Sequence, residues 1–383
     1  MNKDTLIEKR SLNVILTDCS PNWGGQQYRL LREALWLAAH GHKVLVICGK
    51  RSRLGVRLRE HSPQISLHLL RSWGGLHGLL EFFWTVWRWK PDIIHTRSWQ
   101  DSFWGAIAHV VGWTNVHSCH VTPPARLSAR RKFPFRSGCG RVIAAADFIK
   151  KHLVVIAGIP ESRVDVVGEG VDLNEFHPGV DGRGLRAEFG IAEDAPVFGL
   201  VCMIRGEKGY NHFVNAAARV LKTFPNARFI IAGDGEPARV ERLRRKITEM
   251  FPVQPSPVLL VGYREDVPRV MAAIDVLVLP SKQEAQSLVI PQAFATGKPV
   301  IASNVGGIPE NVRDGVNGVL VSPGDENGLA AAMEQLAGSP DLRKRFGAAA
   351  LELARRELSF DMKMDLLLSS YHKAIGRGFI GRA

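Results

Sequence analysis

The sequence offers little that would support a disulfide framework, a structural metal site or a membrane-spanning helix. Its five cysteines lie far apart and form no C-x-x-C pair, which predicts reduced thiols in a cytosolic protein. The first ten residues are charged and lack the apolar core of a signal peptide. The densest apolar run, residues 79–89, is about half the length of a spanning helix and carries two charges. Any membrane contact is therefore expected to be peripheral.

What the sequence does contain is enough apolar residues for two cores, together with a large excess of positive charge. A chain of 383 residues suits two domains of roughly 150–200 residues each. The 50 basic and 37 acidic side chains leave a formal charge of +13. This excess favours an anionic partner, such as a phosphate-bearing substrate or an acidic membrane surface. No nucleic-acid-binding motif is present, so we expect no nucleic acid partner.

Short apolar runs alternate with longer amphipathic ones, which predicts α/β domains with parallel sheets. We expect buried strands at 12–16, 44–48, 92–95, 142–145, 197–203, 229–232, 258–261, 275–279 and 299–302. The segment 174–184 contains one proline and three glycines, as an exposed linker does. We therefore expect two Rossmann-like domains, over 1–176 and 177–357, and a C-terminal helix in 358–383 that returns to the first domain.

Charged residues follow two of the expected strands in the second half, where ligands bind on open α/β sheets. Arg205 and Lys208 stand among glycines after the strand at 197–203, a pattern suited to a diphosphate. Glu284 follows the strand at 275–279, just before an expected helix, and Gln292 lies about two turns further on. Alone, the Arg205–Lys208 pattern suits a solvated basic turn equally well, and Glu284 alone is better explained as an acidic residue at a helix N-terminus.

Taken together, these residues and the segment 275–324, which includes Gly306 and Gly307, resemble the donor-binding half of glycosyltransferase family 4. Members of this family are retaining enzymes with the GT-B fold, in which two Rossmann-like domains face a central cleft. The resemblance extends to residues 168–176 and 262–264 and to Gly24–Gly25, and so covers most of the chain. The run from Glu284 to Gly307 is specific, whereas the other matches would be weak alone.

The resemblance implies a role for each matched position. Glu284 would contact hydroxyls of the donor sugar, and Arg205 and Lys208 would neutralise its diphosphate. Gly262 and Tyr263 would lie against the base. The remaining donor-binding positions are Ala285, Gln286, Ser287, Leu288 and Gln292. The family has a second glutamate at the position of Gln292, and this departure puts the exact donor geometry in question.

In the first half, Gly24–Gly25 resembles the glycine pair that the family places near the diphosphate and the acceptor, although a simple tight turn explains it equally well. His120 stands where many members place a strand-end histidine near the reacting carbon. His95 and His117 are the alternatives, because each is also in or near a strand end.

The resemblance also implies retention of configuration without a metal ion, and no D-x-D motif is present to hold one. We expect no cofactor, since the nucleotide-sugar is a substrate. The residues Arg126, Arg130, Arg131, Lys132 and Arg136, interleaved with Leu127, Phe133 and Phe135, form either a membrane-binding patch or an ordinary solvated loop. The aromatic run 82–89 is expected to pack on the sheet in preference to contacting lipid.

The sequence thus predicts a retaining, metal-independent glycosyltransferase that acts on a glycan or lipid-linked acceptor. We expect a cytoplasmic enzyme of surface polysaccharide or lipopolysaccharide biosynthesis, held peripherally at the inner face of the membrane. Two alternatives stay open at this point: a non-catalytic nucleotide-sugar-binding protein and a GT-B nucleotide-sugar epimerase. The epimerase would need a pair of acid–base carboxylates, which we do not identify.

Overall fold

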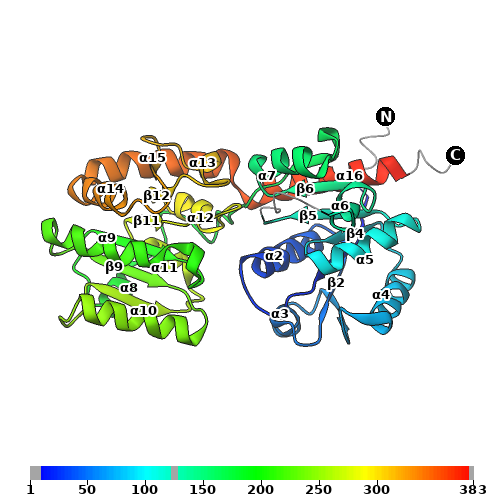
Figure 1. Cartoon of the computed structure of the whole chain (residues 1–383), viewed down its shortest axis with the longest axis horizontal. Helices are drawn as coiled ribbons and strands as arrows, with labels where there is room; N and C mark the ends of the chain where they lie inside the picture. Colours follow the sequence, from blue (N-terminus) through cyan, green and yellow to red (C-terminus); the bar gives the residue numbers. More distant parts are fainter. Residues whose placement is uncertain (1–9, 122–127, 379–383) are drawn as a thin grey trace. The chain divides into compact units, whose positions relative to one another are not determined.

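The computed structural model describes residues 10–121 and 128–378, and it divides into two compact units. Unit 1 comprises Met1–Gly168 and Lys363–Ala383, and unit 2 comprises Glu169–Met362 (Figure 1). Each unit is built around one parallel sheet with helices packed on it. Among the described residues, no helix is long and apolar enough to cross a membrane.

Unit 1 contains a seven-stranded parallel sheet in the order β3-β2-β1-β4-β5-β6-β7. Its strands are β1 (Asn13–Asp18), β2 (Lys43–Gly49), β3 (Ser66–Leu70), β4 (Ile93–Thr96), β5 (Asn115–Cys119), β6 (Arg141–Ala144) and β7 (Val164–Val166). Its helices are α2 (Gly25–Ala39), α3 (Arg53–His61), α4 (Gly75–Trp89), α5 (Trp99–Val110), α6 (Ala129–Arg136), α7 (Asp147–His152) and most of α16 (Phe360–Gly378). Two short helical turns, η1 (Leu153–Ala157) and η2 (Glu161–Arg163), precede β7.

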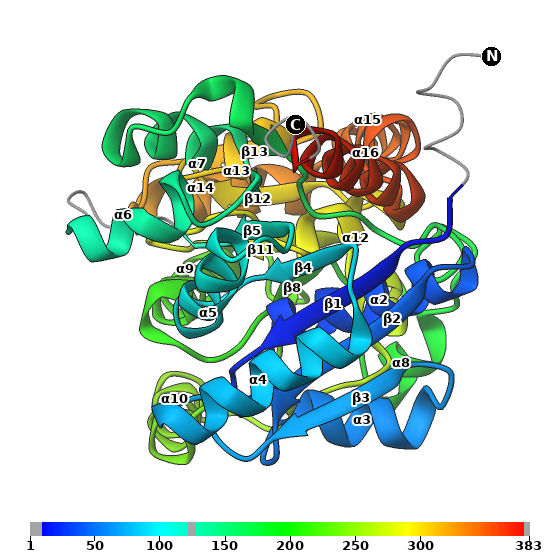
Figure 2. The ribbon, with the colours of Figure 1, turned by 90° about the vertical axis from the view of Figure 1, so that its right-hand side faces the viewer.

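The strand order in unit 1 reverses between β1 and β4, and this reversal decides where the helices lie. Because parallel crossovers are right-handed, α2 and α3 cover one face of the sheet, while α4, α5 and α6 cover the other. Figure 2 shows α4 lying across the near face of the strands, with α2 and α3 behind them.

Unit 2 contains a six-stranded parallel sheet in the order β10-β9-β8-β11-β12-β13. Its strands are β8 (Val197–Val201), β9 (Arg228–Ala232), β10 (Val258–Gly262), β11 (Val276–Leu279), β12 (Val300–Ser303) and β13 (Gly318–Val321). Its helices are α8 (Arg183–Glu188), α9 (Tyr210–Thr223), α10 (Pro237–Met250), α11 (Val267–Ala273), α12 (Val289–Ala295), α13 (Ile308–Asn311), α14 (Glu326–Gly338) and α15 (Pro340–Glu357), with a 3-10 turn η3 (Gly206–Lys208).

The fold class expected from the sequence is confirmed: both sheets are parallel, and the C-terminal helix belongs to unit 1 from Lys363 onward. The boundaries differ from the expected ones. The segment 174–184 lies within unit 2, because Val171 pairs with Ser359 and Phe176, which is 2% exposed, is buried in the core of that unit.

The aromatic run 82–89 forms part of α4, which packs on the sheet through one side, as an amphipathic helix does. Phe82 and Val86 are fully buried against the sheet, but Trp84 and Trp87 are 56% and 64% exposed. In a helix of 3.6 residues per turn, the closely spaced aromatic residues of this run point in several directions, so only some of them reach the core.

Candidate active site

The strand order of unit 2 reverses between β8 and β11, which makes the carboxyl ends of these two strands the place where an open α/β sheet binds its ligand. The loop after β8 carries Arg205 and Lys208, and the loop after β11 carries Glu284. These three residues were predicted from the sequence alone. The topology therefore places all of them at the ends of the two strands that flank the reversal.

Lys208 and Glu284 are in direct contact at this edge. The Lys208 Nζ atom donates to Glu284 Oε2 at 2.6 Å, with the side chains 21% and 9% exposed. Ser281, which is fully buried, donates its hydroxyl to the same oxygen at 3.3 Å. An ammonium group has three N–H donors, so Lys208 keeps two for a ligand while it orients the carboxylate.

Glycines hold these loops against one another at close range. A Cβ atom on Gly209 (φ +71°) would lie 1.9 Å from the Pro280 carbonyl oxygen, and one on Gly306 (φ +55°) would lie 1.7 Å from the Glu284 carbonyl oxygen. The Gly307 N–H donates to the Ala285 carbonyl at 3.1 Å. No side chain fits at either close approach, so glycine is required there and the backbone of Glu284 is fixed by its neighbours.

The loops after β9 and β10 join the same edge. Gly233 donates its N–H to the Gly262 carbonyl at 2.7 Å, and a Cβ atom on Gly233 would lie 1.8 Å from the Cys202 carbonyl oxygen. Gly262 adopts φ +72° with open space where a Cβ would stand, and Tyr263 is 51% exposed. An accessible glycine followed by an exposed ring is compatible with the predicted contact to a base.

Other predicted donor-binding residues lie near this edge with less defined contacts. Arg205 is half exposed and donates to the Met203 sulfur at 3.1 Å, so the structure brings Lys208, and not Arg205, to Glu284. Gln286 accepts from the Glu169 N–H. Ser287 and Gln292 are buried, at 6% and 5% exposed.

Helix α12 begins at Val289, so Glu284 precedes it by five residues and does not cap it. This differs from the expectation of a helix immediately after Glu284. The segment 280–288 instead runs as a loop whose path is fixed by the glycine contacts above.

In unit 1, Gly25 shows no structural requirement for glycine. Gly24 caps α2 with an extended backbone (φ −166°), and a Cβ atom on Gly25 would meet no heavy atom within 4 Å. The turn is open and precedes a helix, as predicted, and its contact with a ligand stays a prediction.

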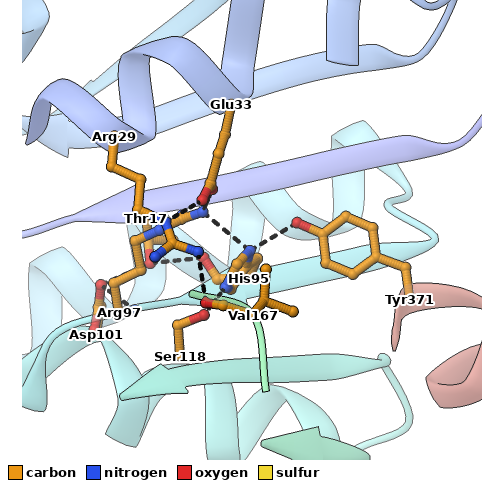
Figure 3. Close-up of polar contacts among 9 residues, drawn as sticks. All are labelled: Thr17, Arg29, Glu33, His95, Arg97, Asp101, Ser118, Val167 and Tyr371. Atoms are coloured by element: carbon orange, nitrogen blue, oxygen red, sulfur yellow. Dashed lines mark hydrogen bonds and ion pairs between the residues drawn. The ribbon is translucent and has the colours of Figure 1, made fainter. Parts of the chain in front are cut away.

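A buried polar network at the carboxyl edge of unit 1 contains His95, one of the candidate histidines (Figure 3). His95 is fully buried, and its Nδ1 atom contacts both Arg97 Nη2 at 3.1 Å and the Tyr371 hydroxyl at 2.7 Å. Arginine only donates, so Nδ1 is the acceptor and Nε2 carries the proton that is donated to Ser118 Oγ at 2.6 Å. Burial, followed by the nearby Arg97 charge, holds the pKa of His95 well below its ordinary value. All donors and acceptors of this ring are used, so we assign His95 a structural role.

His120 differs from His95 in its hydrogen bonding. It follows β5, and its Nε2 atom is enclosed without a hydrogen-bond partner among the residues that the structure describes. Burial, then the charges of Arg29 and Arg97, holds its pKa well below the ordinary value. His120 is therefore a neutral imidazole whose buried Nε2 atom has no partner among the described residues. His117 is buried within β5 and contacts Thr96 Oγ1 at 3.0 Å.

The charged residues of this network were not predicted from the sequence. Arg97 follows β4 directly and forms an ion pair with Glu33, which also binds Arg29 at 2.7 Å. The Arg97 Nε and Nη1 atoms are buried and have no hydrogen-bond partner within the described part of the chain. Burial raises the pKa of Asp101 to about 7, although Thr17 donates to it at 2.7 Å. A charged residue just after a strand was the criterion applied to the second half, and it would have found Arg97.

Within residues 10–121 and 128–378, no three His, Cys, Asp or Glu side chains are grouped so that they could hold a metal ion.

Comparisons with known proteins agree with this geometry. Residues 195–339 match the model of the group 1 glycosyl transferases, and residues 23–175 match the Glycosyltransferase Family 4 model. A D-inositol 3-phosphate glycosyltransferase of Thermobifida fusca is 31% identical over 313 residues, covering 74% of this chain and 70% of the relative. The chain belongs to glycosyltransferase family 4. The enzyme of the same name from Mycobacterium marinum is also 31% identical, over 76% of this chain and 65% of its own length.

This family 4 chain thus spans about two thirds of the length of the curated relatives that it matches. Solved structures show the fold. The Anabaena protein HepE, crystallised with UDP, superposes with a TM-score of 0.83 at 23% identity, over 94% of this chain and 99% of its own. WaaG, a glycosyltransferase involved in lipopolysaccharide biosynthesis, superposes with a TM-score of 0.71 at 18% identity, over 92% and 98%. The chain therefore has the GT-B fold.

Proposed function

We propose that this family 4 protein is a retaining glycosyltransferase that moves a sugar from a nucleotide-sugar donor to a glycan or lipid-linked acceptor. The observation that carries the proposal is the Lys208–Glu284 contact, held by glycine-locked loops where the strand order of unit 2 reverses. A cation for a diphosphate and a carboxylate for sugar hydroxyls lie side by side there, as a nucleotide-sugar requires.

Each donor group has a proposed partner. Lys208 and Arg205 bind the diphosphate, Arg205 by turning its exposed side chain toward it. Glu284 accepts hydrogen bonds from sugar hydroxyls, and Gln292 reads the ribose with its amide. The backbone of residues 285–288 contributes N–H groups, and Gly262 and Tyr263 lie against the base. These roles rest on family membership and on the positions described above.

The proposed chemistry breaks the bond between the anomeric carbon and the diphosphate oxygen. The acceptor hydroxyl attacks from the same face, and its proton passes to the leaving diphosphate. Arg205 and Lys208 stabilise the charge that develops on that group, which is catalysis by preorganised electrostatics. We propose no step through a metal ion, because these cations can supply the charge.

Unit 1 contributes His120 and the Gly24–Gly25 turn in this proposal. The unfilled Nε2 atom of His120 would contact the sugar near its reacting carbon. We further propose a cytoplasmic site of action, peripheral at the inner face of the membrane, in surface polysaccharide or lipopolysaccharide biosynthesis. The WaaG neighbour and the formal charge of +13 support this placement.

Release of nucleoside diphosphate from purified protein, with and without a glycan acceptor, tests the proposal. UDP-glucose is the first donor to use, because HepE has been crystallised with it. Acceptor-dependent release together with a glycosylated product is expected. Binding without release would indicate a nucleotide-sugar-binding protein, and a changed sugar released without an acceptor would indicate an epimerase.

A further inference from the structure

Helix α4 exposes an apolar stripe on the side that faces away from the sheet. Leu76, Leu80, Trp84 and Trp87 are 68%, 58%, 56% and 64% exposed. Their spacing of four, four and three residues puts all of them on one helical face. The opposite face is anchored, since Phe82 packs on Trp73 and Trp104. The stripe is therefore a fixed surface feature of a well-packed helix and not a frayed end.

Helices α5 and α6 neighbour α4 and add further exposed apolar side chains. Contacts of Phe82 with Trp104 and of Phe83 with Trp113 join α4 to α5 and its following turn, and Phe103 with Phe133 joins α5 to α6. On α5, Trp99 is 45% exposed and Val110 is 64% exposed. All three helices lie on the same face of the sheet, as the strand order requires (Figure 2).

Cations predominate among the charged side chains that accompany these apolar residues outward. The three helices contain two acidic residues: Asp101 is fully buried, and Glu81, whose side chain is 23% exposed, accepts from the Arg71 N–H at 3.2 Å and lies 3.3 Å from His68 Nε2. The exposed cations of these helices are Arg88, Arg130, Arg131 and Arg136. We call this set, together with Leu76, Leu80, Trp84, Trp87, Trp99 and Val110, the α4–α5–α6 surface.

Two of the cations lie over exposed indole rings. The Arg88 guanidinium is 5.8 Å from the Trp84 ring centre, and that of Arg131 is 5.3 Å from the Trp99 ring centre. Indole rings beside guanidinium groups suit a lipid headgroup layer, where the ring enters the boundary of the acyl chains and the cation meets phosphate.

We propose that the α4–α5–α6 surface docks on an anionic lipid bilayer. Charge favours this occupant over a second copy of the chain: a symmetric dimer through this face would oppose two sets of four exposed arginines, with only the partly buried Glu81 of each copy to offset them. This surface and its anionic lipid partner specify the membrane placement proposed above. Docking does not depend on transferase activity, because it needs no donor or acceptor.

Flotation of the full-length protein with vesicles tests this proposal without any catalytic readout. The vesicles contain phosphatidylcholine alone or phosphatidylcholine with phosphatidylglycerol, at low and moderate salt. We expect binding that requires phosphatidylglycerol and weakens as salt rises. Trp84→Ser with Trp87→Ser should lower the partition coefficient about 100-fold, and Arg130→Ser with Arg131→Ser should lower it about 30-fold.

Matched variants elsewhere control for loss of apolar surface and of charge. Val253→Ser with Met362→Ser removes exposed apolar side chains from unit 2, and Arg242→Ser with Arg245→Ser removes two exposed cations from α10. Both should float as the wild type does, and Trp84→Phe with Trp87→Phe should retain most of the binding. Wild-type flotation of the Trp→Ser variant, or indifference to phosphatidylglycerol, would overturn the proposal. The proposal would also be overturned if the wild-type protein does not float and instead forms a dimer that Trp84→Ser with Trp87→Ser dissociates.

Discussion

At the scale of single residues, substitutions of Glu284 and Gln292 separate sugar recognition from ribose recognition in the proposed donor site. If Glu284 reads the sugar, Glu284→Gln should lower transfer about 100-fold and change the Kd of free nucleoside diphosphate by no more than about threefold. If Gln292 reads the ribose, Gln292→Ala should weaken nucleotide binding itself about tenfold. Steady-state transfer and calorimetric titration of UDP measure the two effects. The reverse pattern would show that the roles are exchanged.

The buried histidines of unit 1 make its stability depend on pH. Burial, with the nearby Arg97 charge, lowers the pKa of His117 to about 4, from an ordinary value of 6.5. Because the unfolded chain binds the proton first, the stabilisation is complete above pH 6.5 and is lost as the pH falls toward 4. This single group accounts for about 3 kcal/mol over that range. Asp101 has the opposite sign, since its pKa is raised from 3.8 to about 7: its stabilisation is complete below pH 3.8 and is lost as the pH rises from there to about 7.

Urea unfolding followed by tryptophan fluorescence measures this effect in unit 1 alone, because all nine tryptophans lie between Trp23 and Trp113. His117→Asn should flatten the fall in unfolding free energy between pH 6.5 and 4.5. His77→Asn, at an exposed position on α4, serves as the control and should leave the slope as it is. An unchanged slope in His117→Asn would mean that this ring is not held neutral by burial.

At this scale the sequence predicted which residues stand after the strands but not how their side chains are paired. Lys208 and Glu284 were predicted in separate loops, and the structure joins them. Arg205, two residues from Met203, turns to the Met203 sulfur instead. The side-chain conformations of Lys208 and Arg205 depend on packing against segments that are distant in the sequence. The spacing of residues along the chain gives no information about that packing. The catalytic and binding roles of these residues stay predictions.

At the scale of elements, glycine contacts are what hold the donor loops. Gly306→Ala would place a methyl group against the Glu284 carbonyl oxygen and add the cost of a positive φ. We expect it to lower the stability of unit 2 by at least about 3 kcal/mol and to abolish UDP binding. Gly324→Ala is the control: its φ of +79° carries the same backbone cost, but the space around it is open. Gly324→Ala should therefore lower the free energy of unfolding of unit 2 by only about 1 kcal/mol.

Circular dichroism follows unfolding of the whole chain in this comparison, while the fluorescence transition of unit 1 serves as an internal reference. Equal losses of unfolding free energy in Gly306→Ala and Gly324→Ala would contradict the close approach of Gly306 to Glu284.

Strand positions near this site were predictable from apolar runs alone, as for 229–232 and β9. The late start of α12 and the exposed face of α4 were not, because both depend on tertiary contacts.

At the scale of the whole molecule, the chain leaves unit 1 and returns to it. The sequence analysis expected this return, and the structure shows that Tyr371 of α16 is fully buried and bonded to His95, 276 residues earlier in the chain. Tyr371→Ala should therefore destabilise unit 1 by about 3–5 kcal/mol, and Tyr371→Phe by about 1 kcal/mol. Leu366→Ala, on the exposed side of the same helix, should have little effect on the tryptophan transition. If Tyr371→Ala leaves that transition unchanged, α16 does not stabilise unit 1.

The central claim is that the cation bound to Glu284 works on the donor diphosphate, and the transfer rate of Lys208→Ala tests it most directly. Lys282→Ala is the matched control, because Lys282 is an exposed lysine in the neighbouring loop whose backbone N–H, and not its side chain, bonds Glu207. With saturating UDP-glucose and acceptor, Lys208→Ala should transfer roughly two to three orders of magnitude more slowly than the wild type. Lys282→Ala should transfer at close to the wild-type rate. Equal rates in the two variants would contradict the claim.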